Sequence, residues 1–145
     1  MIKASLELYD KAYDTKLYSS EVEDLLMLTA ATESDLGAYL MQMNNGPAEG
    51  IYQMEPIAKQ QSNNRSNKVF GLPLIWRPYC LETQTVFARL YYTSFPEPIP
   101  ARKDYVSEDD YWWALAVYYK KYWNTEAGAN TIERAYNDSK HFVWG

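Results

Sequence analysis

The sequence has only one cysteine and one histidine, which limits the chemistry that it can support. Cys80 alone can form no disulfide within the chain, and it provides no thiolate cluster for a metal ion. His141 lies near the end of the sequence, where a lone histidine is more often a surface residue than part of a Ser-His-Asp or Cys-His site. These scarcities favour a function that needs neither a metal ion nor a nucleophile activated by histidine.

Long apolar runs and clusters of basic residues are also lacking. No stretch approaches the roughly 18 apolar residues that indicate a membrane span, and the first residues lack the apolar run of a signal peptide. The formal net charge is −5, without a basic patch that would bind phosphates. We therefore expect no transmembrane segment, no signal peptide and no nucleic-acid partner.

Aromatic residues, by contrast, are abundant. Of the 145 residues, 47% are hydrophobic and 16% are aromatic, and the aromatic residues include 14 tyrosines and 5 tryptophans. This composition is typical of a folded chain, and the length favours a single domain over residues 1–145. Most of the rings are expected in the core, although their flat apolar faces also suit stacking on a ligand.

Helical periodicity is the main structural signal in the sequence. The spacing of apolar residues, together with capping signals, predicts helices over residues 20–33, 56–61, 81–95, 107–123 and 131–140. Ser20 followed by Glu23 has the form of a capping box at the start of the first of these helices. The polar residues 62–67 are expected to form a loop or a frayed helix end, and the turn signal at residues 44–47 predicts a chain reversal. Because no convincing pair of strands is present, the fold is expected to be mainly α.

Glu33 is the most informative carboxyl group in the sequence. It ends the predicted helix 20–33, where the negative end of the helix dipole disfavours an ionised carboxylate. A short Gly-Ile-Tyr-Gln-Met segment, residues 50–54, follows the predicted chain reversal. An acid that stays protonated near neutral pH is suited to general acid catalysis. Glu33 at the end of the predicted helix, together with the segment of residues 50–54, is therefore a candidate catalytic acid.

Two segments resemble the lysozyme-like superfamily, in particular soluble lytic transglycosylases and a phage and prophage group of transglycosylase-like proteins. The first segment is Thr-Ala-Ala-Thr-Glu-Ser-Asp-Leu-Gly at residues 29–37, and the second is Gly-Pro-Ala-Glu-Gly-Ile-Tyr-Gln-Met-Glu-Pro at residues 46–56. In these families a Glu-Ser pair ends the catalytic helix, and a Gly-Leu-Met-Gln type of turn lines the floor of a saccharide cleft. The resemblance implies a mainly α, single-domain lysozyme-like fold with a cleft, of the soluble lytic transglycosylase type.

The resemblance also implies roles for individual residues. Glu33 would be the catalytic acid and base, and the substrate-binding residues would be Ser34, Gly50, Tyr52, Gln53, Tyr91, Tyr136 and Asn137. The residues alone leave structural roles open for some of these, because Ser34 could cap the helix end and Tyr52 and Tyr91 could belong to the core. The Ala-Tyr-Asn segment at residues 135–137 departs from many soluble transglycosylases, because no glycine follows it.

The implied reaction is cleavage of the bond between N-acetylmuramic acid and N-acetylglucosamine in peptidoglycan. In a lytic transglycosylase, one Glu protonates the bridging oxygen and then accepts the proton of the muramoyl 6-hydroxyl, which closes an anhydro ring. A hydrolase needs a second carboxylate, for which Asp35, Glu49 and Glu55 are the nearby candidates. Asp35 and Glu55 are expected to be mainly structural, with Glu55 capping the helix that starts at Pro56. The sequence leaves the product open, and neither a metal ion nor a cofactor is implied.

The implied partners are peptidoglycan glycan strands, with phage virion proteins as further candidates. Without a signal peptide, the protein is expected in a phage virion, or in the bacterial cytoplasm before delivery to the periplasm and cell wall. An alternative from another class is a virion structural or adaptor protein that keeps a lysozyme-like fold and has weak or no activity.

Overall fold

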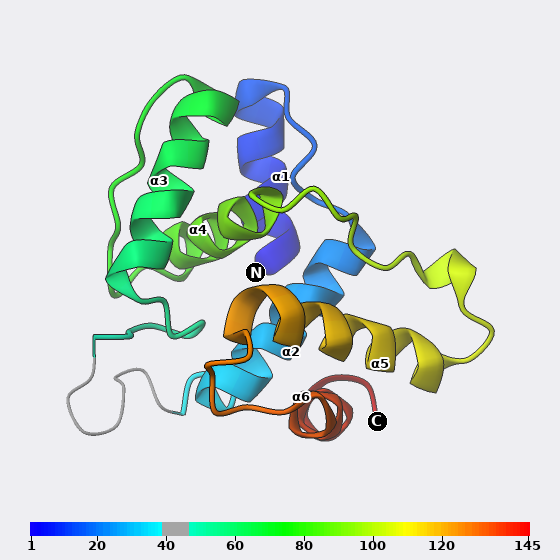
Figure 1. Cartoon of the computed structure of the whole chain (residues 1–145). Helices are drawn as coiled ribbons and strands as arrows, with labels where there is room; N and C mark the ends of the chain where they lie inside the picture. The colour runs from blue at the N-terminus through cyan, green and yellow to red at the C-terminus, as the bar shows by residue number, and fades with distance from the viewer. Residues whose placement is uncertain (39–46) are drawn as a thin grey trace.

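The computed structural model describes residues 1–38 and 47–145, which are mainly helical. Its α-helices are α1 (Ile2–Tyr13), α2 (Ser20–Ser34), α3 (Pro56–Phe70), α4 (Leu81–Thr93), α5 (Glu108–Tyr119) and α6 (Ile132–Ser139) (Figure 1). A short 3-10 turn covers Arg102–Asp104, and π-helical turns at Lys120–Asn124 and Lys140–Trp144 extend α5 and α6. Within the described ranges, β pairing is limited to one antiparallel bridge between Glu49 and Met54.

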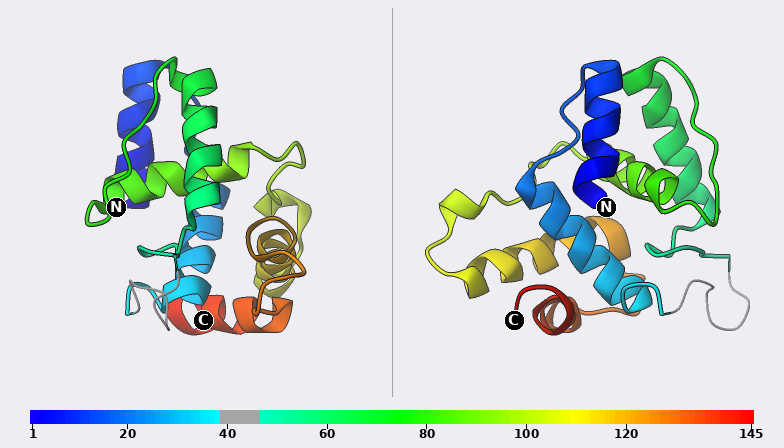
Figure 2. Two further views of the ribbon diagram at one scale, coloured as in Figure 1. Left: turned by 60° about the vertical axis from the view of Figure 1, so that its left-hand side comes forward. Right: turned by 180° about the vertical axis from the view of Figure 1, so that it is seen from behind.

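Helix α2 lies at the centre of the arrangement. Helices α1, α3 and α4 gather at one end of the molecule and α5 and α6 at the other, with α2 running between them (Figures 1 and 2). Four of the other helices, α1, α4, α5 and α6, contact α2, whereas α3 packs on α4. The two groups of helices therefore share α2 as their common support.

The sequence of α2 explains this central position. Its apolar and small residues are distributed around the whole helix, so most of its 15 residues are buried, as expected for a helix surrounded by protein. The hydroxyl of Ser19 accepts a hydrogen bond from the Val22 N–H at 3.1 Å and caps the first turn. The expectation that Ser20 is the cap was therefore wrong by one residue, because the chain is still extended at Ser19.

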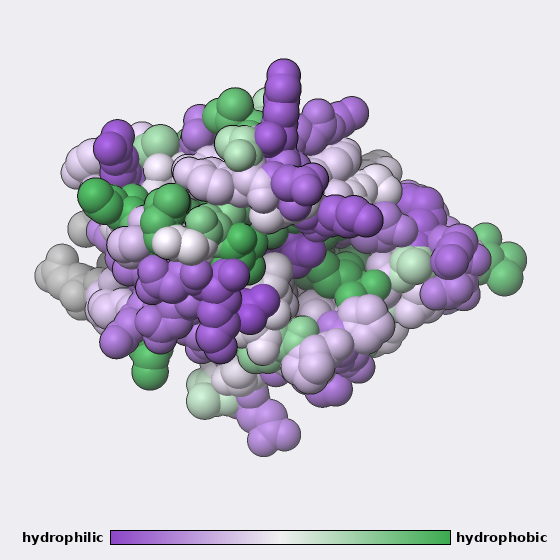
Figure 3. Space-filling view, turned by 90° about the horizontal axis from the view of Figure 1, so that it is seen from above, coloured by the Kyte–Doolittle hydropathy of each residue, from purple (hydrophilic) through white to green (hydrophobic). Residues whose placement is uncertain are grey.

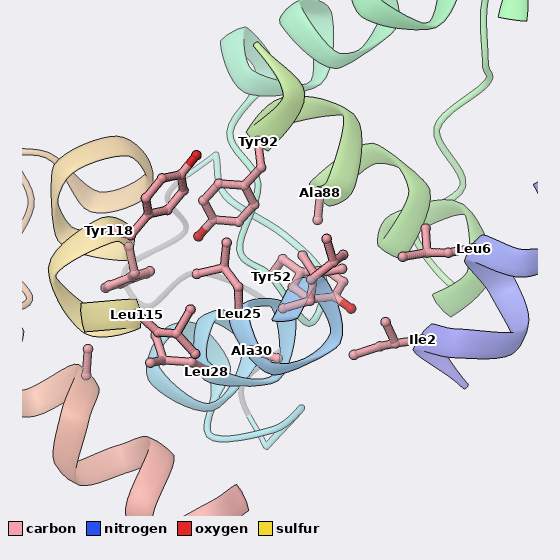
Figure 4. Close-up of a cluster of buried hydrophobic side chains, with 14 of the residues drawn as sticks. Ile2, Leu6, Leu25, Leu28, Ala30, Tyr52, Ala88, Tyr92, Leu115 and Tyr118 are labelled. Atoms are coloured by element: carbon pink, nitrogen blue, oxygen red, sulfur yellow. The ribbon is translucent and has the colours of Figure 1, made fainter. Parts of the chain in front are cut away.

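The hydrophobic core forms where α4 and α5 pack on α2. Figure 4 shows this cluster, which includes Leu25 and Leu28 of α2, Ala88 and Tyr92 of α4, and Leu115 and Tyr118 of α5. Some buried hydroxyl groups pair with one another inside the core, as between Thr29 and Tyr92 at 2.8 Å. Such pairing removes the cost of burying an unsatisfied hydroxyl group.

Most of the helix predictions are confirmed, and two features differ. The polar residues 62–67 are helical rather than a loop, because small serines allow α3 to approach α4 closely and Ser62 donates a hydrogen bond to the Phe87 carbonyl at 2.8 Å. Helix α1 was not predicted. The predicted reversal at residues 44–47 lies almost entirely outside the described residues. The mainly α fold is confirmed, and its lysozyme-like form stays a prediction.

The surface has a mixed polarity. On the face shown in Figure 3, hydrophobic residues occur in several groups among hydrophilic ones. None of the helices in the described ranges combines the length and the apolar character that crossing a membrane requires.

We expect Leu25→Ala to lower the free energy of unfolding by about 2–5 kcal/mol, because Leu25 is fully buried and its truncation leaves a cavity between α2 and its neighbours. Urea unfolding monitored by circular dichroism measures this change. As a matched control, Leu8→Ala removes the same atoms from a side chain that is 55% exposed on α1, and should change the stability by no more than about 0.5 kcal/mol. Equal losses in both variants would contradict the central position of α2.

Candidate active site

A cleft of about 910 Å³ opens at the C-terminal end of α2. Its walls come from segments that are far apart in the sequence: the end of α2, residues 48–58, Tyr91 of α4, residues 123–130 and Arg134 of α6. Polar and charged side chains line the cleft alongside apolar ones, and its volume is in the range of small-molecule and substrate sites.

Glu33 is half-buried in the wall of this cleft and belongs to a short series of hydrogen bonds. The Tyr119 hydroxyl donates a hydrogen bond to Glu33 Oε1 at 2.5 Å, and Asn130 Nδ2 donates to the Tyr119 hydroxyl oxygen at 2.9 Å. These partners come from the end of α5 and from the loop before α6. Because Asn130 donates to the Tyr119 hydroxyl oxygen, the Tyr119 proton is free to point at Glu33, and the two bonds together hold Glu33 Oε1 in place.

Burial raises the pKa of Glu33 to about 7. The hydrogen bond from Tyr119 and the positive charge of Arg134 act in the opposite direction, whereas the negative charge of Glu55 adds to the increase. Burial has the largest effect because an ionised carboxylate loses its hydration there. A carboxyl group with this pKa is present in both protonation states near neutral pH and can therefore both donate and accept a proton.

A tight turn at residues 49–54 faces the end of α2, as the sequence predicted. The Ser34 hydroxyl donates to the Ile51 carbonyl at 2.5 Å, and Ile51 N–H donates to Gln84 Oε1 at 2.9 Å. Gly50 has a φ of +84°, and a Cβ atom there would lie 2.6 Å from Gln84 Oε1. Ser34 and Gly50 therefore hold the turn against α2 and α4, and neither lines the cleft.

Two of the predicted substrate-binding residues do line the cleft. Gln53 lies at the tip of the turn with a φ of 50°, and its Nε2 donates to the Gly50 carbonyl at 2.9 Å. Tyr91 lies on the wall formed by α4, where its ring meets the Trp123 ring edge to face at 5.1 Å. These two residues combine an amide with a flat aromatic surface, a combination that suits a polyhydroxylated ligand.

Three other predicted substrate-binding residues lie elsewhere. Tyr52 is only 1% exposed and its hydroxyl pairs with Thr85 at 3.0 Å, so it belongs to the core, the alternative that the sequence left open. Tyr136 donates to Asp109 at 2.6 Å, and Asn137 is exposed on α6. Because Ala135 of α6 faces the core, the two residues that follow it turn away from the cleft.

The three candidates for a second carboxylate have different surroundings. Glu49 accepts hydrogen bonds from Lys59 at 2.5 Å and from Trp76 Nε1 at 2.6 Å, and the bond from Lys59 lowers its pKa, so it is a structural residue. Asp35 and Glu55 both line the cleft. Glu55 occupies the N-cap position of α3, but its side chain makes no capping hydrogen bond, contrary to the expectation from the sequence.

Sequence reasoning did not identify several residues that complete the cleft. Tyr119, Asn130 and Arg134 surround Glu33 although they lie about a hundred positions away in the sequence. The signal in the sequence was the aromatic richness of residues 107–123, which does not indicate which ring reaches the carboxylate. Within the described part of the chain, no group of three or more His, Cys, Asp or Glu side chains is placed to hold a metal ion.

Comparisons with protein-family models, with curated proteins and with solved structures find no match to this chain. The cleft and the two short segments around Glu33 are therefore the features of this protein that indicate a function.

We expect Glu33→Gln to stabilise the protein at pH 8 and to have little effect at pH 4. In the unfolded chain Glu33 ionises near the ordinary glutamate pKa of 4.5, and in the folded protein its pKa is about 7. The stability that protonated Glu33 contributes is complete below pH 4.5 and is lost as the pH rises through about 7. Glutamine imitates the protonated form, so at pH 8 the gain should be on the order of 1–3 kcal/mol.

Urea unfolding at the two pH values measures this difference. Glu7→Gln, on the exposed face of α1, provides a matched control in which the same substitution is made away from the cleft. An effect of Glu33→Gln that is the same at pH 4 and pH 8 would contradict the raised pKa.

Proposed function

We propose that this protein is a peptidoglycan-cleaving enzyme of the lytic transglycosylase type, with Glu33 as its general acid and base. The observation that carries the proposal is the half-buried Glu33 carboxyl group, which lines a large cleft and whose pKa is raised to about 7. A glycosidic oxygen is a poor leaving group until it is protonated, so cleavage at neutral pH requires such an acid.

In the first step, protonated Glu33 donates its proton to the oxygen that bridges N-acetylmuramic acid and N-acetylglucosamine. The bond from the muramoyl C1 to that oxygen breaks, and N-acetylglucosamine leaves as an alcohol. In the second step, the Glu33 carboxylate accepts the proton of the muramoyl 6-hydroxyl while the oxygen of that hydroxyl bonds to C1. The product is a 1,6-anhydro ring, and Glu33 is protonated again.

The surroundings of Glu33 support both steps. Burial favours the protonated acid before cleavage, and the hydrogen bond from Tyr119 stabilises the carboxylate that forms after it. The Tyr91 and Trp123 rings on the cleft wall offer apolar faces on which sugar rings can pack. Gln53, from the turn of residues 49–54, offers an amide group for hydrogen bonds to hydroxyl or acetamide groups.

Asp35 and Glu55 provide a route to the hydrolytic alternative. Both line the cleft, and an ionised carboxylate placed across the glycosidic bond from Glu33 can activate water. The product then carries a reducing muramoyl end. A phage or prophage origin, a location in the virion or in the cytoplasm before delivery, and contacts with virion proteins are supported by the sequence resemblance.

We expect the wild-type protein to release soluble fragments with anhydro-muramoyl ends from purified peptidoglycan, as measured by mass spectrometry. Glu33→Gln should reduce the release at least about 10³-fold, because glutamine has no proton to donate. Glu7→Gln should retain full activity, which controls for the substitution itself.

Reducing muramoyl ends instead of anhydro ends would indicate a hydrolase, and activity that is lost in Asp35→Asn or Glu55→Gln would then identify the second carboxylate. No release by a folded sample, across walls of several chemical types, would refute the enzymatic proposal and favour a virion structural or adaptor protein.

We expect Tyr119→Phe to move the alkaline limb of the pH–activity profile above its wild-type position near pH 7. The hydrogen bond from Tyr119 lowers the pKa of Glu33, so its removal raises that pKa and keeps the acid protonated at higher pH. Tyr118→Phe is the matched control, because the Tyr118 hydroxyl donates to the Glu97 carbonyl at 2.8 Å and does not contact Glu33. A limb that stays in place in Tyr119→Phe would refute the role given to this hydrogen bond.

A further inference from the structure

A second cavity lies away from the cleft around Glu33. It has a volume of about 490 Å³ and is bounded by the start of α2, the C-terminal half of α4 and the proline-rich segment of residues 95–101. None of its lining residues also lines the cleft. The proposed function therefore leaves this cavity without a role.

Arg89 of α4 is the cationic residue in the wall of this cavity. Its Nε donates a hydrogen bond to the Leu17 carbonyl at 2.7 Å, which anchors the guanidinium group beside the start of α2. Within the described residues, the guanidinium takes part in no ion pair and makes no other hydrogen bond. A guanidinium group has five N–H donors, so the four on its two terminal nitrogens are left for a ligand.

The partial burial of the Arg89 charge favours an anionic partner. Burial lowers the pKa of its guanidinium group, and the Tyr118 hydroxyl and the Asp10 carboxylate act in the opposite direction. Asp10 is already engaged with the Leu17 and Tyr18 N–H groups at 2.6 and 2.9 Å. A partly desolvated cation without a close counter-ion is costly, and a carboxylate that binds its two terminal nitrogens would remove that cost.

Two carboxylates also lie in the wall of the cavity, and both are engaged. Glu21 accepts hydrogen bonds from the Ser20 hydroxyl at 2.9 Å and from the Arg102 N–H at 3.2 Å. Glu97 is exposed and pairs with Lys121 at 3.4 Å. Their negative charges would repel a phosphate or another multiply charged anion, whereas a single carboxylate can approach Arg89 with less repulsion.

The rest of the wall is largely apolar. It consists of Val22 of α2 and, from the segment that follows α4, Phe95, Pro96, Pro98, Ile99 and Ala101. The hydroxyl-bearing residues Ser19 and Thr93 complete the lining. The cavity thus offers one cationic anchor and apolar surface for a small body attached to the anion.

We propose that this cavity binds the C-terminal carboxylate of a short apolar peptide, with the two terminal nitrogens of Arg89 paired to the carboxylate and the apolar side chains packed against residues 95–101. The cavity volume is sufficient for about two small residues. Such a terminus can belong to a cell-wall peptide with D-residues or to a protein chain with L-residues, which share this chemistry. The proposal does not depend on the activity of Glu33.

The test is an NMR titration of the ¹⁵N-labelled wild-type protein with acetyl-Ala-Ala, using the L,L and the D,D peptide, each as free acid and as C-terminal amide. We expect shifts at the N–H groups of Val22, Arg89 and Thr93, and affinity for the acid at least about tenfold higher than for the amide, because the amide cannot pair with a guanidinium group. A preference for the D,D acid would indicate a wall peptide, and a preference for the L,L acid a protein terminus.

Variants separate this cavity from the cleft. Arg89→Gln should abolish the preference for the acid, and Arg89→Lys should keep part of it because a point charge remains. Glu33→Gln should bind as the wild type does, so loss of peptidoglycan cleavage would leave this result unaffected. Equal binding of acid and amide by the wild-type protein, shifts confined to the cleft, or no binding at all would overturn the proposal, whether or not the Arg89 variants fold.

Discussion

The C-terminal end of α2 is where a mostly buried helix opens into the cleft. Four other helices contact α2, so its apolar residues are all used in packing, and only the last turn opens into the cleft. Glu33 occupies that turn, with protein around most of its carboxyl group and the cleft beyond it. The same packing that stabilises the fold therefore removes water from Glu33 and raises its pKa.

The site also depends on contacts that hold the end of α2 in place. Ser34 fastens the turn of residues 49–54 to the helix, and Gln84 of α4 fastens it from the other side. On the opposite wall, Asn130 orients Tyr119, which in turn binds Glu33. Because each wall of the cleft is tied to α2 or α4, the position of Glu33 relative to both walls follows from the packing of the core.

The helices show how far periodicity alone can predict this fold. Residues 20–33, 81–95 and 107–123 have clear apolar spacing, and α2, α4 and α5 form there. The polar residues 62–67 have no such spacing, yet they are helical, because Ser62 and Ser66 are small enough to pack against neighbouring chain and donate to its carbonyl groups. Local sequence carries no information about that contact, so the polar run resembled a loop.

The sequence by itself determined that the chain is mainly helical, that Glu33 ends a helix, and that a glycine-containing turn follows, because helical spacing, capping and turn chemistry are local properties. Only the tertiary structure decided which residues share the cleft. Gln53 and Tyr91 reach it, whereas Tyr52 is enclosed in the core and Tyr136 faces Asp109. Contacts across the core, such as that between Glu33 and Tyr119, depend on how distant helices pack, and no local pattern in the sequence encodes that packing.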